Sequence, residues 1–153
     1  MSIKARIEDA ELLWQHGRKE GTWALALIAA AATSRKRYPR PIRDSEAFKS
    51  FIRDVLPTLM FGKSLQSTTP NPSIIFDQTP IEEIIYEHLR CNLIHEGDPA
   101  PQIAFSESII VDGKLQAMLA VGSPNVIPDI WVINLLKAVR EAPENTAEFG
   151  TAA

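Results

Sequence analysis

Residues 79–97 read TPIEEIIYEHLRCNLIHEG, and the fold and function that the sequence predicts both depend on this stretch. Its aliphatic residues recur at steps of three and four, which is typical of a helix with one buried face. Thr79 is a suitable N-cap, Pro80 suits the first helical position, and Gly97 can close the last turn. These signals predict a helix over residues 80–96, with an apolar face formed by Ile81, Ile84, Ile85, Leu89 and Leu93.

The same helix carries an unusual set of polar residues near its end: His88, Arg90, Cys91, Asn92 and His95. One residue turns an α-helix by about 100°, so His88, Cys91, Asn92 and His95 share a stripe. Arg90 and His95 are five positions apart, which places them about 140° from each other around the axis. They are therefore not neighbours on one ridge, although both could border a groove that a second surface closes.

Three interpretations of these residues are open. A histidine can take a proton from a ribose 2′-hydroxyl while an arginine holds the phosphate, which suits metal-independent RNA cleavage. Alternatively, His88, Cys91 and His95 are metal-ligand types at helical spacing, although the only other histidine is His16 and Cys91 is the only cysteine. In the third interpretation the histidines and Cys91 only pack in the core, and Arg90 pairs with Glu87, three residues earlier, or with Glu83.

The N-terminal half of the chain predicts three further helices. Residues 4–16 have a helical pattern that ends near Gly17, and residues 18–38 form an alanine-rich stretch that is apolar nearly all round. That second helix is expected to be central in a bundle. Asp44 or Ser45 can cap a third helix, which Pro57 is expected to kink or end early. Residues 62–73 have the composition of a loop.

The C-terminal half combines a hairpin with a last helix. Asp112-Gly113 separates two apolar runs, which is a strong hairpin signal. Residues 130–142 predict the last helix, capped by Asp129. The expected fold is mainly α, a bundle of about five helices with one β-hairpin before the last helix. We expect a single domain over residues 1–142 and a flexible tail over residues 143–153.

Composition restricts the class of protein. The chain has 153 residues, of which 45% are hydrophobic and 23% charged, as in a globular domain that needs no disulfides. Its longest uncharged run, residues 21–34, is shorter than the roughly 20 residues that span a membrane. A cytoplasmic protein with no membrane association is expected. The net charge of −3 provides no global attraction for nucleic acid, so any such binding needs a local patch.

One local patch is present in residues 35–43, which contain five cations: Arg35, Lys36, Arg37, Arg40 and Arg43. Arg35, Arg37 and Arg40 are the candidate contacts to RNA phosphates. In the alternative interpretation, cations at the end of a helix complement its dipole and extend into water. No glycine-rich phosphate loop accompanies the patch.

The segment RCNLIH, residues 90–95, resembles the hallmark of the HEPN superfamily (higher eukaryotes and prokaryotes nucleotide-binding), an arginine followed after four to six residues by a histidine. The preceding tyrosine, the closing HEG and the hairpin before a last helix are also similar to this family of helical bundles. The resemblance covers about residues 5–141, and its specific part is the six-residue motif.

This resemblance implies a metal-independent endoribonuclease of a toxin, defence or RNA-processing system, without a metal or other cofactor. It implies a homodimer in which two copies of the 80–96 helix face each other, and RNA or an antitoxin-like protein as further partners. Arg90 would stabilise the phosphate, and His95 would act as general base or acid. Asn92 or His88 would orient the reacting groups. Active members usually have a polar residue directly after the arginine, where this sequence has Cys91. The alternative is a non-catalytic nucleotide-binding or protein-interaction module.

Overall fold

The computed structural model describes residues 2–63, 75–76, 79–116, 118–120, 122 and 124–150. The predicted mainly helical fold is confirmed, and it is accompanied by short strand pairs. The chain divides into two compact units, one within Met1–Pro72 together with Val132–Ala153 and one within Ser73–Trp131. The sequence had predicted a single domain over residues 1–142, so this division was not foreseen. Most of the predicted loop at residues 62–73 lies outside the described residues.

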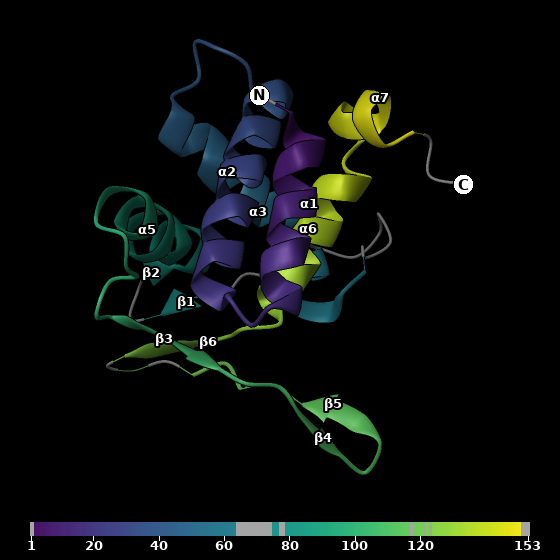
Figure 1. Ribbon diagram of the computed structural model, residues 1–153. Coiled ribbons are helices and arrows are strands. Elements are labelled where there is room, and N and C mark those ends of the chain that lie inside the picture. Colours follow the sequence, from purple (N-terminus) through teal and green to yellow (C-terminus); the bar gives the residue numbers. More distant parts are fainter. Residues whose placement is uncertain are drawn as a thin grey trace. The chain divides into compact units, whose positions relative to one another are not determined.

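The first unit, here called the helical unit, is built from α1 (Ile3–Gln15), α2 (Lys19–Arg37), α3 (Asp44–Phe61) and α6 (Trp131–Glu141), the last from Val132 onward. Helix α2 packs against both α1 and α3 (Figure 1). Its side chains Trp23, Ala26, Leu27, Ala29 and Ala30 are almost fully buried. The predicted central position of this alanine-rich helix is therefore confirmed.

Helix α3 differs from its prediction at both ends. Arg43 is its N-cap residue and no side chain caps it, so neither Asp44 nor Ser45 has the predicted capping role. Pro57 lies inside the helix, which continues to Phe61 instead of ending early. Buried residues on both sides of the proline, Phe51, Leu56 and Leu59 among them, pack into the core. This packing outweighs the missing backbone hydrogen bond of the proline.

The C-terminal segment was predicted to be a flexible tail from residue 143, but it folds onto the helical unit as far as the structure describes it. A 3-10 turn, η2 (Pro143–Asn145), leads into α7 (Thr146–Phe149). Asn145 is completely buried, and its amide donates to the Thr33 hydroxyl at 2.9 Å and the Val139 carbonyl at 2.8 Å. Glu148 accepts hydrogen bonds from the backbone and side chain at the start of α1.

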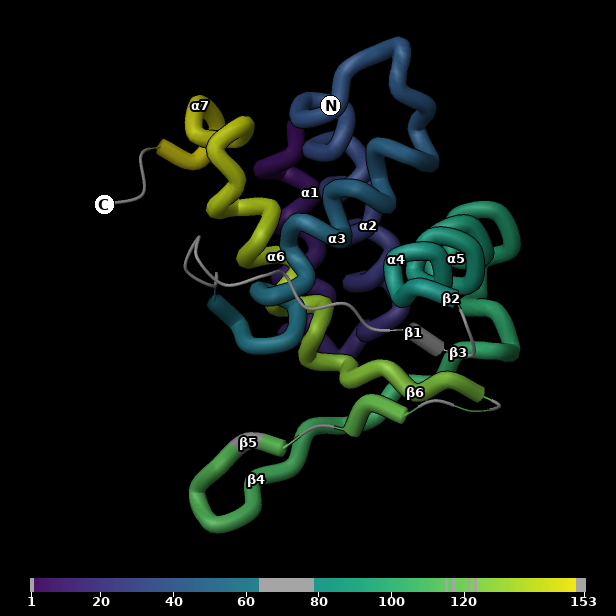
Figure 2. The backbone as a smooth tube through the Cα atoms, turned by 180° about the vertical axis from the view of Figure 1, so that it is seen from behind, coloured from purple at the N-terminus to yellow at the C-terminus, as the bar shows by residue number. Residues whose placement is uncertain are grey.

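The second unit, here called the strand unit, contains three strand pairs and the helix that carries residues 90–95. This helix is called the motif helix below. The helix has three consecutive segments, α4 (Ile81–Ile84), the π-helical η1 (Ile85–Cys91) and α5 (Asn92–His95). Immediately before this helix, strand β1 (Ile75–Phe76) pairs antiparallel with strand β2 (Thr79–Pro80). Strand β3 (Ile103–Ser106) pairs parallel with β6 (Asn125–Pro128), and the two strands lie side by side in Figure 2.

The predicted hairpin is confirmed as β4 (Ile109–Val111) and β5 (Lys114–Gln116), joined by Asp112 and Gly113. Both turn residues have positive φ, 51° and 76°, which is the combination that a type I′ turn needs. The parallel β3–β6 pair was not predicted. Its strands are separated by the whole hairpin, so no local pattern indicates their pairing.

Candidate functional site

The apolar face of the motif helix is as the sequence predicted. Ile81, Ile84, Ile85, Leu89 and Leu93 are all buried. The start of the helix differs, because Thr79 and Pro80 form strand β2 and no side chain caps the first turn. Gly97 has a φ of 83° and closes the other end as expected. The buried face fixes which side of the helix, and therefore which motif residues, solvent can reach.

The middle of the helix does not have the α-helical geometry that the sequence analysis assumed. From Ile85 to Cys91 the backbone is π-helical, with hydrogen bonds to the fifth residue along the chain. The chain then folds back after the helix, and the buried Ala100 donates its N–H to the carbonyl of His88 at 2.8 Å. The rotation of about 100° per residue therefore does not apply between His88 and Cys91. π-Helical turns are rare and frequently mark functional sites.

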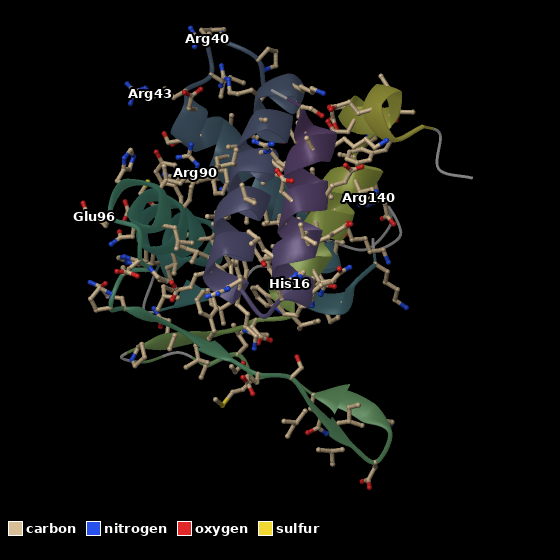
Figure 3. All side chains as sticks on the ribbon, in the orientation of Figure 1. His16, Arg40, Arg43, Arg90, Glu96 and Arg140 are labelled. Atoms are coloured by element: carbon tan, nitrogen blue, oxygen red, sulfur yellow. The ribbon has the colours of Figure 1, made fainter. Side chains whose placement is uncertain are left out.

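His95 and Arg90 differ in their exposure on this helix. His95 is exposed, whereas Arg90 is half-buried and its Nε is shielded from solvent. The guanidinium carbon of Arg90 lies 5.4 Å from the centre of the Tyr86 ring, within range of a cation–π contact that favours one orientation of the arginine. Figure 3 shows Arg90 on this helix, with Glu96 at the exposed end. The sequence analysis did not predict this contact. An aromatic residue four positions before an arginine can nevertheless indicate that the two side chains meet on one face of a helix.

The remaining candidate residues of the motif are half-buried. His88, Cys91 and Asn92 all fall in this class. Among the described residues, no three His, Cys, Asp or Glu side chains are close enough to hold a metal ion. In that same part of the chain, no helix is long and apolar enough to cross a membrane. The candidate residues of the motif supply a guanidinium, two imidazoles, an amide and a thiol.

The basic patch on the helical unit is largely engaged in ion pairs. Arg37 donates from Nε and Nη2 to the two carboxylate oxygens of Glu144 at 2.7 and 3.1 Å, and from Nη1 to Asp54 at 3.3 Å. Arg35 lies 3.1 Å from a carboxylate oxygen of Asp44. A phosphate would have to displace these carboxylates.

Arg40 and Arg43 are the exposed arginines of the patch, and both extend from the connection between α2 and α3 (Figure 3). Of the three predicted RNA contacts, Arg40 is thus the one that solvent reaches most readily.

The hydrogen bonds between Arg37 and Glu144 change the pKa of both groups. They raise the pKa of Arg37 and lower the pKa of Glu144 below the usual range of a carboxyl group.

The mainly helical fold and the motif helix define a small helical protein with a polar, accessible helix end. A family model described as Rv1289 matches residues 2–151, so the chain belongs to the Rv1289 family. Neither a curated protein nor a solved structure matches the chain.

Proposed function

We propose that this chain is a HEPN-like, metal-independent endoribonuclease whose reaction centre contains Arg90 and His95. The observation that supports the proposal is the exposure of His95 and the partial exposure of Arg90 near the end of a helix whose opposite face is buried. The cation–π contact with Tyr86 also holds Arg90 ready for a phosphate, which lowers the entropic cost of binding.

In the proposed reaction His95 accepts the proton of a ribose 2′-hydroxyl, and the 2′-oxygen attacks the adjacent phosphorus. The bond between phosphorus and the 5′-oxygen breaks, leaving a 2′,3′-cyclic phosphate and a 5′-hydroxyl, which takes up a proton. Arg90 stabilises the negative charge on the phosphoryl oxygens. His88 or Asn92 orients the reacting groups. No metal ion participates in any of these steps.

The proposal includes a homodimer through the 80–96 helix. Arg90 and His95 are five positions apart near the end of the helix, and a second copy of the helix would complete a groove between them. Ile94 supports this arrangement, because it lies next to His95 and 42% of this large aliphatic residue is exposed. Because 42% of Ile94 is exposed, its burial in an interface is favourable by about 0.6–1.3 kcal/mol, the same share of the value for a complete side chain.

The test is incubation of the purified protein with total RNA in the presence of a chelator. We expect cleavage products with 2′,3′-cyclic phosphate ends. His95→Ala is expected to lower the rate by about 10²–10⁴-fold, the usual contribution of a general acid or base. Arg90→Lys keeps the charge but loses the bidentate geometry, and we expect a clear loss of rate as well. Cys91→Asn introduces a polar group directly after the arginine and is expected to increase the rate.

The matched controls are His16→Ala and Arg18→Lys, because both residues are exposed and lie on the other unit. These controls are expected to leave cleavage unchanged, and circular dichroism verifies that each variant is folded. Cleavage that survives His95→Ala would refute the proposal. If RNA binds without being cleaved, and Arg90→Lys weakens that binding, the chain is a non-catalytic binding module instead.

A further inference from the structure

Hairpin β4–β5 presents an unusually apolar surface to solvent. The exposed fractions of Ile109, Ile110 and Val111 are 58%, 76% and 38%, and that of the nearby Met118 is 57%. Successive residues of a strand point to opposite faces, so Ile109 and Val111 occupy one face and Ile110 the other. A two-stranded hairpin is marginally stable by itself, and exposed aliphatic residues on both faces add nothing to its stability. This composition is typical of a strand pair that a partner covers.

The backbone of β4 has an open edge at Ile110. A two-residue turn connects the paired residues Val111 and Lys114, so these two exchange hydrogen bonds. Hydrogen-bonded and non-bonded pairs alternate along an antiparallel ladder, and Ile110 is therefore in a non-bonded pair with Leu115. The N–H and C=O of Ile110 point away from β5. Among the described residues β4 has no strand neighbour other than β5, so this edge can accept another strand.

The two edges of the hairpin are not equivalent. Native edge strands are usually protected from association by a lysine, a proline or a bulge. Strand β5 has Lys114, whereas β4 consists only of Ile109, Ile110 and Val111. Strand β5 therefore has a charged residue within the strand, whereas in β4 the charges lie only outside its ends, at Glu107 and Asp112.

A groove at the base of the hairpin has room for a large side chain. Its volume is about 480 Å³, and it is lined by Ser106, Glu107, Ile109, Gln116 and Met118. The hydroxyl of Ser106 donates to the carbonyl of Met118 at 2.6 Å, which joins the two sides of the hairpin base. The lining combines aliphatic surface with one carboxylate. An aromatic or long aliphatic side chain with a neighbouring cation matches that combination.

The charges at the ends of β4 indicate which kind of strand can pair with it. Glu107 precedes the strand, Asp112 follows it, and both are exposed. If β4 paired antiparallel with a second copy of itself, the acidic ends of the two strands would be brought together. Like charges opposite each other destabilise a strand pair, whereas opposite charges stabilise it. The edge therefore disfavours its own copy and favours a strand with basic ends.

We propose that β4 is a docking edge for an extended segment of another protein, with an apolar centre and with Lys or Arg at both ends. The segment adds to the sheet beside Ile110 through backbone hydrogen bonds, as in other cases of β-strand addition. One large apolar side chain enters the groove beside Met118. This interaction does not depend on Arg90, His95 or RNA.

The experiment measures fluorescence anisotropy of labelled synthetic peptides with the full-length protein, without RNA. Three peptides share an alternating Ile/Val centre that includes one Phe. The first has Lys at both ends, the second has Glu, and the third has Lys with the amides on one edge N-methylated. We expect the first to bind at least about tenfold more tightly than either of the others, because two charge pairs or the backbone bonds are lost. High salt is expected to reduce the difference in affinity between the peptide with Lys ends and the peptide with Glu ends.

Ile110→Pro removes the outward N–H without removing a bond to β5, a position where proline is tolerated. We expect it to weaken binding of the first peptide at least about tenfold, and Ile109→Ser to weaken it through the groove. Leu12→Ser is the matched control, since Leu12 on α1 is 55% exposed. Equal binding of the three peptides, or no binding at about millimolar peptide, overturns the proposal. A dimer in sedimentation that Ile110→Pro dissociates also overturns it, because a second copy would then occupy the edge.

Discussion

Asn145 provides the sharpest test of how the C-terminal segment contributes to stability. Its side chain is completely buried and makes three hydrogen bonds in the helical unit. Its amide nitrogen donates to Thr33 and Val139, and its oxygen accepts from the Lys36 ammonium at 3.1 Å. These contacts connect η2 to α2 and α6, which are far from each other in sequence. Removal of the side chain should therefore lower the stability of the whole helical unit.

The expected magnitude follows from those three contacts. Two neutral hydrogen bonds contribute about 1 kcal/mol each, and the bond from the Lys36 ammonium contributes about the same, because its side chain is 42% exposed and solvent screens the charge. Asn145→Ala is therefore expected to lower the free energy of unfolding by about 3 kcal/mol. For a chain of this size that corresponds to a decrease of about 6–12 °C in Tm. Urea denaturation followed by circular dichroism measures the difference directly.

Two further variants separate the possible causes. Asn145→Asp keeps the volume and the contact with Lys36, but replaces the donor to the Val139 carbonyl with an oxygen, so it should destabilise at least as much as alanine. Asn134→Ala removes a single part-buried bond, from its amide to the Leu59 carbonyl, and should cost only about 1 kcal/mol. If the free energy of unfolding of Asn145→Ala is within about 1 kcal/mol of that of the unaltered protein, the contacts of Asn145 do not stabilise the unit and this reasoning is wrong.

Two other predictions concern the ion pair and the hairpin. Because hydrogen bonding from Arg37 lowers the pKa of Glu144, the pair stabilises the fold above the unfolded carboxyl pKa of about 4.3, and this stabilisation is lost as the pH falls through the lower folded pKa. The difference in unfolding free energy between Glu144→Gln and the unaltered protein should therefore shrink between about pH 6 and pH 3 in urea titrations, and a constant difference would contradict this. Gly113→Ala places a side chain at a φ of 76°, which costs about 1 kcal/mol. Hydrogen exchange should then accelerate in β4 and β5, with unchanged protection in α1.

The sequence predicted most of the local structure because its signals are local. The helices that became α1 and α2 were recognised within one or two residues of their ends, from apolar spacing and from a glycine at position 17. The turn at Asp112-Gly113 was equally readable, since few other residue pairs adopt positive φ at both positions. The buried face of the motif helix also followed from spacing alone.

The predictions that failed depend on contacts with residues outside the helical segment itself. Thr79 was expected to cap a helix but pairs in a strand with Phe76, which a propensity rule cannot indicate. Pro57 remains inside α3 because the packing on both sides of it outweighs a local penalty. The π-helical stretch coincides with a backbone contact from Ala100, a residue that lies beyond the end of the helix.

The candidate site was only partly predictable for the same reason. Arg90 and His95 were identified by their types and spacing, and their accessibility agrees with a role at a surface. The main partner of Arg37 was not foreseen, because Glu144 is more than a hundred positions from Arg37. That distant carboxylate engages Arg37, whereas Arg35 is paired with Asp44 in the same part of the chain.

The sequence by itself determined the helices, the hairpin turn, the apolar face of the motif helix and the polar residues at its end. All of these depend on the backbone preferences and spacing of neighbouring residues. Only the tertiary structure decided that Asn145 is buried, that β3 lies parallel to β6 and that β4 has an open apolar edge. The first two features require hydrogen bonds and packing between segments far apart in the chain, and such contacts form only when the whole unit folds. The third depends on which strands come to lie beside β4.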